Sequence, residues 1–241
     1  MKVFIYLYIL LTSTFLFSQD SSPMLLPYPA SDYLVIPGLS AMEVKEAQTI
    51  TKTKSVEGSP YLYKNWYNEA EVYHNHKVYK FNSFNYNVYA ERFEAKVSED
   101  SIFIINPRYI DKIVIKDRPF KRYLDPEFQR NSYFEEIAKT DDFEIVRKYF
   151  TKIREADINP LTKVQEGSSK LIQHEMYYLI YRENQDLKRF KLKKSSVLKL
   201  IDKNYYNDIK SFKNRNRLKY NNIEDVAKII QYYNTVSYKD I

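Results

Sequence analysis

Apolar and polar residues alternate through the middle of the chain in a pattern that predicts antiparallel β-strands. Every second residue from Phe84 to Ala90 is apolar, which is the period of a half-buried strand. The alternation changes phase at Glu91–Arg92, so a β-bulge or a tight turn is expected there. Farther along, Gln173–Tyr181 and Leu187–Leu192 predict a hairpin across Glu183–Asp186. These segments indicate a β meander.

The segment Phe134–Ile153 fits two structures. A helix that begins after Asp141–Asp142 would place Phe143, Val146 and Phe150 on one face. A hairpin that turns at the same two aspartates would place Phe143 and Tyr149 on one face of a strand instead. Periodicity alone does not choose between them.

The last fifty residues predict short helices. Ser195–Ser196 precedes an apolar cluster that begins at Val197, as a helix cap would. Asn222 precedes a longer helix with Asp225 at the capping-box position. The apolar residues of this last helix fall on one face and are Ile223, Val226, Ala227, Ile229, Ile230 and Tyr233. Strands followed by short helices predict an α+β fold.

Four regions follow from these patterns. Residues 1–18 are expected to be a signal peptide, because Lys2 precedes the apolar run Val3–Phe17 and Ser18 offers a small residue before cleavage. Residues 19–60 contain five of the nine prolines and are predicted to be a flexible leader. Residues 61–192 form the antiparallel β-rich domain, and residues 193–241 form a basic helical segment that packs on it.

Composition narrows the chemistry. The chain is 44% hydrophobic and 29% charged over 241 residues, as in globular proteins. With three glycines, phosphate-cradling loops of the P-loop or Rossmann kind are excluded. With no cysteine, disulfides, thiolate nucleophiles and cysteine-ligated metals are excluded as well. We therefore expect no cofactor and assign no catalytic, cofactor-binding or metal-ligating residue.

Positive charge is concentrated near the C-terminus. Twelve Lys or Arg and two acids between residues 188 and 220 give a local charge of +10, so the rest of the chain carries −3 of the overall +7. Such a segment is most often a solvated surface, and weak contact with anionic lipid is its alternative role. An exported protein rarely meets nucleic acid, so none is expected as a partner.

His74 and His76 are the most suggestive pair of side chains. On a strand they would share a face and could hold a metal with Glu69 or Glu71. They also lie between Val72–Tyr73 and Val78–Tyr79, where a hairpin turn is expected. The turn is the better interpretation.

Other polar residues give weaker signals. His174 beside Glu175 could act as a general base, although a histidine on the polar face of a strand is more common. Paired carboxylates occur at Glu69/Glu71, Glu135/Glu136 and Asp141/Asp142. Such pairs are too numerous in this chain for any one of them to indicate a glycosidase.

From about Tyr61 to Thr235 the chain resembles a family of uncharacterised exported proteins common in Bacteroidota. The resemblance is carried by Phe84–Glu91, Phe190–Leu200 and Ile229–Asn234. It implies export and an α+β fold, and it favours the hairpin interpretation of Phe134–Ile153. The chain has aspartates where similar proteins tend to have glycine at the hairpin turn. The family has no established activity.

The sequence thus predicts an exported protein of the periplasm or outer membrane, or a secreted one. Its expected role is non-enzymatic binding or structure, with a protein of the envelope as partner. The alternative is a hydrolase or metal-dependent enzyme that uses carboxylates with His74 and His76.

Overall fold

The computed structural model describes residues 35–36, 39–45, 56–96, 101–163, 165–183 and 186–238. The predicted signal peptide, residues 1–18, lies outside the described residues. The chain divides into Met1–Ser31 and Asp32–Ile241, and every described residue belongs to the second unit. None of the helices in the described ranges is long and apolar enough to cross a membrane.

The larger sheet is almost entirely antiparallel. Its strands lie in the order β16-β15-β12-β11-β10-β9-β4-β5, with β3 pairing in parallel against β15. The bounds are β3 Val56–Glu57, β4 Ala70–His74, β5 Lys77–Phe81, β9 Lys112–Ile115, β10 Arg118–Asp125, β11 Arg130–Lys139, β12 Phe143–Arg154, β15 Ser169–Tyr181 and β16 Leu187–Phe190.

A second sheet has the order β1-β2-β8-β7-β6. Its strands are β1 Val35–Ile36, β2 Leu39–Lys45, β6 Phe84–Asn87, β7 Arg92–Lys96 and β8 Ser101–Ile105. A short ladder of β13 Asp157–Ile158 and β14 Gln165–Glu166 completes the strands. The helical segments are η4 Pro107–Tyr109, α1 Lys194–Leu198, η5 Lys203–Tyr205, α2 Tyr206–Arg215 and α3 Ile223–Ser237. The α+β prediction, with antiparallel strands and short C-terminal helices, is confirmed.

The hairpin turns follow the local chemistry. Asn75 and His76 both have positive φ, at 47° and 61°, and join β4 to β5 in the two-residue turn that matches strand twist. Lys116 and Asp117 do the same between β9 and β10. The phase change at Glu91–Arg92 is a turn between β6 and β7.

The ambiguous segment Phe134–Ile153 is a β-hairpin. β11 and β12 pair antiparallel, and Asp141–Asp142 lies in the connecting turn. The hairpin predicted across Glu183–Asp186 is also present, as β15 and β16. Both results follow from alternation that continues on each side of a polar turn.

Two local predictions differ from the structure. Lys193 is the N-cap residue of α1, so Ser195–Ser196 lies inside the first turn. By contrast, the Asn222 side chain caps α3 by accepting from the Asp225 N–H. Within residues 19–60, which were predicted to be a leader, the structure places β1, β2 and β3.

Two hydrophobic cores lie on the same face of the large sheet, one at Tyr149 and the other at Phe143 and Ile145 of β12. The first joins the sheets and contains Phe84, Phe93, Phe120 and Tyr149. The second lies beneath α1, α2 and α3, which we call the helical layer, and includes Ile145 of β12. Val226, Ile229 and Ile230 of α3 are fully buried there. This confirms the apolar face predicted for the last helix.

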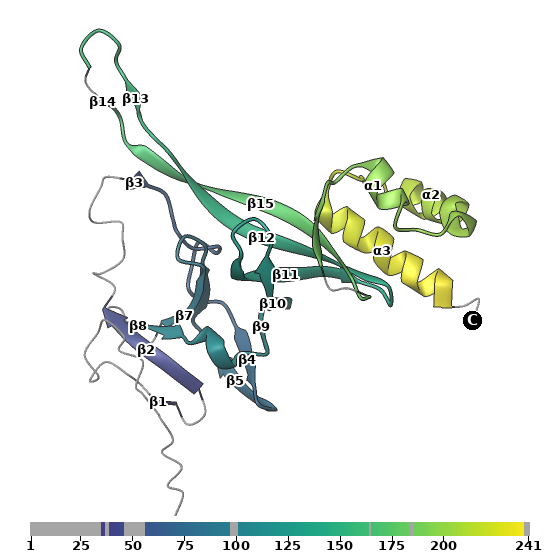
Figure 1. Cartoon of the computed structure of the whole chain (residues 1–241), viewed down its shortest axis with the longest axis horizontal. Coiled ribbons are helices and arrows are strands. Elements are labelled where there is room, and N and C mark those ends of the chain that lie inside the picture. The colour runs from purple at the N-terminus through teal and green to yellow at the C-terminus, as the bar shows by residue number, and fades with distance from the viewer. Residues whose placement is uncertain are drawn as a thin grey trace, which may run out of the picture. The chain divides into compact units, whose positions relative to one another are not determined.

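The large sheet divides at Arg147, at a point that we call the fork. β11 pairs with β12 from Glu135↔Arg147 to Lys139↔Glu144, but its earlier residues pair with β10 alone. β12 and β15 continue together to Arg154↔Lys170 (Figure 1). Residues 150–174, which include this extension and the β13–β14 ladder at its end, are called the arm.

Candidate functional site

The two histidines of the predicted pair lie at the β4–β5 turn. His74 ends β4 and is buried, and its ring Nε2 lies 3.2 Å from Asn75 Nδ2. His76 is an exposed turn residue. The described residues contain no group of three His, Cys, Asp or Glu side chains arranged to hold a metal ion.

The predicted carboxylate pairs are separated by their hydrogen bonds. Glu71 accepts from the Tyr73 hydroxyl at 2.6 Å and pairs with Lys80, which holds the pKa of Glu71 below its usual value. It shares a cavity of about 550 Å³ with Glu69, and the lining of that cavity does not include His74 or His76. This cavity therefore does not bring Glu69 and Glu71 together with His74 or His76, the combination on which the enzyme alternative was based.

His174 and Glu175 also diverge. Neighbouring residues of a strand point to opposite faces, and the His174 ring stacks on Phe150 while Glu175 faces Arg147. The pair Glu135–Glu136 diverges in the same way, since Glu136 bonds to Lys121. Asp141 bonds to the Tyr238 hydroxyl at the hairpin turn.

At the fork, Arg147 binds three carboxylates. Its Nε and Nη2 donate to Glu135 at 2.9 and 3.0 Å, and its Nη1 reaches Glu175 and Glu224. The Tyr149 hydroxyl donates to Glu135 at 2.6 Å. Because Glu224 belongs to α3, this cluster ties the helical layer to the point where the sheet divides.

Burial and the Glu135 carboxylate together set the pKa values of Arg147 and Tyr149. Burial tends to lower the pKa of Arg147, but the bonds and charge of Glu135 outweigh it, so the pKa is raised and the guanidinium stays charged. Burial and the Glu135 carboxylate raise the pKa of Tyr149 well above its ordinary value. At neutral pH the cluster therefore holds a fixed cation and a neutral phenol.

A second cluster lies on the opposite face of β12. Lys148 is fully buried, and its ammonium donates to Asp125 at 2.5 Å and to Ser132 at 3.2 Å. Glu91 lies 3.5 Å from the same nitrogen. Two of the three lysine donors are thus hydrogen-bonded, and a second carboxylate lies close to the charge. The Phe128 ring lies 4.5 Å from the ammonium.

The ionised groups of both clusters are paired with one another. Arg147 pairs with Glu135, Glu175 and Glu224, and Lys148 pairs with Asp125 and Glu91. A buried charge that loses its partner is strongly destabilising. The clusters therefore stabilise the region where β11 leaves β12.

The arm has no core of its own. No described side chain between residues 152 and 167 is buried. The exposed fraction is 65% at Ile158 and 91% at Leu161, which lies in the loop between β13 and β14. Ile153 is also exposed, opposite Leu171 in the ladder. The arm thus presents apolar side chains to solvent along its length and at its tip.

The base of the arm is held on the β15 side. β3 pairs with Ser169 and Lys170, and the Gln173 side chain donates to the carbonyls of Ser59 and Tyr61. Gly58 has a φ of +116°, and a Cβ at this position would lie 2.8 Å from the Leu171 carbonyl oxygen. Only glycine allows the two backbones to approach so closely.

The basic segment 188–220 is exposed. Eleven of its twelve Lys and Arg side chains are open to solvent, and Lys213 is half-buried. Within the described part of the chain, Arg189 forms the one ion pair of this segment, with Glu127. The helical layer therefore carries a dense and largely unneutralised positive charge on its surface.

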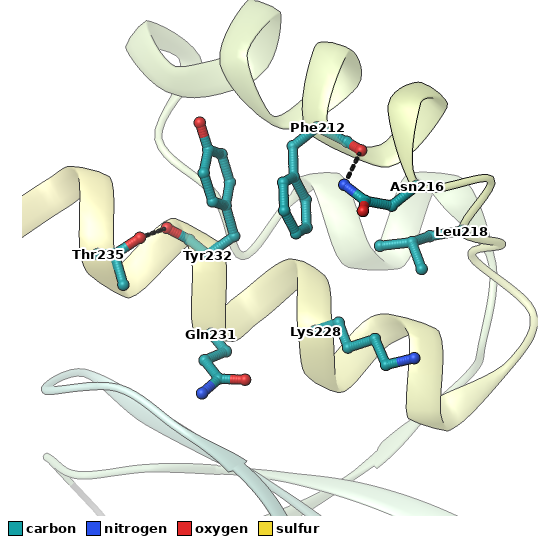
Figure 2. A pocket seen from close by; sticks show the side chains of 7 residues that line it. All are labelled: Phe212, Asn216, Leu218, Lys228, Gln231, Tyr232 and Thr235. Atoms are coloured by element: carbon teal, nitrogen blue, oxygen red, sulfur yellow. Dashed lines mark hydrogen bonds between the residues drawn. The ribbon is translucent and has the colours of Figure 1, made fainter.

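A groove between α2 and α3 has a volume of about 340 Å³. Figure 2 shows the Phe212 and Tyr232 rings beside each other, parallel and 4.0 Å apart. Asn216 and Thr235 line the groove, but each donates to a backbone carbonyl of its own helix segment. The groove is open to solvent, and its lining gives no set of groups that converge on one ligand.

No family model, curated protein or solved structure matches this chain. The geometry therefore carries the functional argument alone. The arm and the fork were not predicted from the sequence. One signal for the arm was present, because Ile158, Leu161 and the intervening Asn159–Pro160 lie between two polar stretches.

Proposed function

We propose that this chain is an exported, non-enzymatic binding protein of the cell envelope, and that the arm is the element that contacts a protein partner. The observation that carries the proposal is the exposure of the arm, which contains the last five of the twelve β12–β15 pairs and has no buried described side chain between residues 152 and 167. An isolated two-stranded hairpin is marginally stable in water. A partner would supply the missing apolar contacts.

The arm also contains a feature that opposes its own stability. Arg154 and Lys170 are directly opposite each other in the ladder. Like charges in that position destabilise a strand pair. Residues selected for the stability of the hairpin alone would avoid this arrangement, whereas a surface that meets an acidic partner would retain it.

The energetics favour the tip as an anchor. Leu161 has almost its whole surface to lose, and full burial of a leucine side chain is worth about 2 kcal/mol. Ile158 adds a second apolar side chain within three residues. Hot spots of protein interfaces are formed by a few such residues at the centre of a contact.

The cellular location in the proposal is motivated by the sequence. The apolar run Val3–Phe17 after Lys2 is typical of a signal peptide, and the chain contains no cysteine that an oxidising compartment would alter. The basic surface of residues 188–220 would then face anionic envelope lipids, with weak affinity.

Position-specific photo-crosslinking in cells that make the protein tests the proposal. A photoreactive residue at Leu161 or Ile158 should give one discrete adduct, whose protein component mass spectrometry identifies. The same residue at Tyr67, which is 86% exposed but distant in sequence from the arm, is the control and should give none. Equal adducts from all three positions, or none from the arm, would contradict the proposal.

A variant separates contact from folding. Leu161→Asp should abolish the adduct formed from Ile158, because it places a charge in the proposed apolar contact. It should change the free energy of unfolding by less than about 0.5 kcal/mol, since the side chain is exposed in the free protein. An adduct that persists in this variant would show that the tip is not the anchor.

A further inference from the structure

The arm has one covered edge and one open edge. On the β15 side, β3 pairs with Ser169 and Lys170, and the chain at Ser59 and Tyr61 binds Gln173. On the β12 side, the last pairing with β11 is at Arg147. Among the described residues, no strand pairs with that side of β12 from Thr151 to Arg154.

An open strand edge presents unpaired backbone N–H and C=O groups at the spacing of a further strand. Proteins use such edges to take up an extended peptide, because its main chain supplies affinity and its alternate side chains supply specificity. The β12 edge is anchored at the fork by the buried Arg147 and Lys148 clusters, so its backbone is held in strand geometry before a peptide arrives.

The side chains along this edge define the peptide. Lys152 and Arg154 lie on one face of β12, while Thr151 and Ile153 lie on the other. None of the described residues forms an ion pair with Lys152 or Arg154. Three acids line a cavity with Arg154. Glu57 pairs with Lys170 and Glu155 accepts from Ser169, while no ion pair joins Asp157 to Arg154 among the described residues.

A second copy of this chain does not fit the edge. If two β12 edges paired antiparallel about Ile153, Lys152 of each copy would lie opposite Arg154 of the other. Four cations would then form two like-charged cross-strand pairs, which are destabilising. The same charges favour a strand that places acids at those positions.

We propose that the β12 edge from Thr151 to Arg154 binds an extended, acidic segment of a partner protein as an added β-strand. The segment alternates Asp or Glu, opposite Lys152 and Arg154, with β-branched residues opposite Thr151 and Ile153. This inference rests on the proposed function and names the chemistry of the partner. It does not depend on the tip residues Ile158 and Leu161.

Short synthetic peptides test the inference on the full chain. A fluorescent peptide that alternates Glu with Val should bind, and one that alternates Lys with Val should not. A peptide of the same composition with all Glu residues in one block keeps the charge but loses the alternation, and it should bind about tenfold more weakly. Equal binding of the alternating and block peptides would overturn strand addition.

Charge reversal at Lys152 and Arg154 tests whether the peptide binds at the β12 edge. Lys152→Glu with Arg154→Glu should weaken the Glu peptide by about tenfold or more and should create binding of the Lys peptide. The matched control is Lys64→Glu with Lys163→Glu, which reverses two exposed charges away from this edge and should leave the preference for the Glu peptide in place. Equal loss in both variants would mean general charge attraction and would overturn the assignment.

Amide hydrogen exchange with the Glu peptide bound supplies an independent readout. Protection should rise in Thr151–Arg154 of β12, and protection that rises only in the basic segment 188–220 would contradict the proposed edge. If Leu161 forms crosslinks but the peptides do not bind, the proposed function stands and the proposed strand addition is wrong. Peptide binding at the edge without crosslinks from the tip would leave this inference and remove the tip as the anchor.

Discussion

The two halves of the β12–β15 ladder have the same backbone pairing and different surroundings. From Phe143 to Arg147, the helical layer covers one face, and a small core around Phe134 and Tyr178 covers the other. Beyond Phe150 the same two strands continue with no buried side chain between residues 152 and 167. Regular strand pairing therefore does not distinguish the two halves, whereas burial does.

The comparison separates the part of the ladder that stabilises the fold from the part that we propose binds a partner. The packed half contributes the free energy that holds the fold, since buried apolar area is the dominant favourable term. The arm adds exposed apolar surface and an open edge, neither of which stabilises the free protein. The fork, with its buried charged clusters, lies between the two parts.

The largest effect is expected at the helical layer. Ile230→Asp places a charge in a fully buried site and should lower the free energy of unfolding by about 4 kcal/mol, measured by chemical denaturation. Gln231→Asp, on the exposed side of the same helix, is the control and should change it by less than about 0.5 kcal/mol. Similar stabilities for the two variants would mean that the helix does not cover the sheet.

The next largest effect is expected at the fork. Lys148→Met removes the cation that pairs with buried Asp125 and should cost about 3 kcal/mol, since it leaves an uncompensated buried carboxylate. Adding Asp125→Asn should restore part of that loss, because the amide oxygen can still accept from the N–H groups of Glu127 and Phe128. A double variant less stable than Lys148→Met alone would contradict the pairing.

Several features of the packed half followed from the sequence, and the fork did not. The Asn222 cap, the β15–β16 hairpin and the turn at Glu91–Arg92 each depend on residues close together in the chain. The fork depends on where β11 stops pairing with β12, which no local pattern encodes. Arg147 and Lys148 are buried charged residues, and nothing in the neighbouring sequence indicates that burial.

The other features that the sequence did not predict also depend on contacts between residues that are distant in the chain. β2 and β3 lie in a proline-containing stretch and pair with β8 and β15, which are distant in sequence. The exposure of the arm also depends on tertiary context, because its alternation of apolar and polar residues resembles that of a half-buried strand. Single-sequence patterns therefore predicted the strands but not which of them are covered.

Alkaline pH should destabilise the packed regions. Burial raises the pKa of Tyr133 to about 12, and burial and Glu135 raise that of Tyr149 further. The unfolded chain then releases protons near the ordinary tyrosine pKa of 10.0 while the folded chain does not, so stability is complete below that pH and falls as the pH rises. Each such tyrosine should remove about 1.4 kcal/mol per pH unit.

Urea unfolding from neutral pH to about pH 11 measures this slope. Tyr149→Phe should make the slope shallower because it removes one of the titrating groups. Tyr67→Phe should leave it unchanged, since this tyrosine is 86% exposed. Equal slopes for the two variants would show that buried tyrosines do not cause the loss of stability at alkaline pH.

The smallest effect is expected at the basic surface. The natural chain should sediment weakly with anionic vesicles at low salt and should not do so at physiological salt, because exposed charges about a Debye length from lipid are screened. Changing Lys191, Lys193, Lys194 and Lys199 to Gln should remove the low-salt binding. Changing Lys64, Lys77, Lys116 and Lys163 instead removes the same charge elsewhere and should preserve it. Binding that persists at physiological salt would make the helical layer a membrane contact.

Amide hydrogen exchange along β12 and β15 in the free full chain tests the central claim most directly. The account predicts slow exchange, close to the global unfolding limit, for Phe143–Arg147 and for the opposite residues Tyr177–Tyr181. It predicts faster exchange, through local opening, for Thr151–Arg154, where no side chain is buried and where no described strand pairs with the outer edge. Uniformly slow exchange along the whole ladder would contradict the claim that the β12 strand of the arm is less stable than the packed half and leaves surface for a partner to cover.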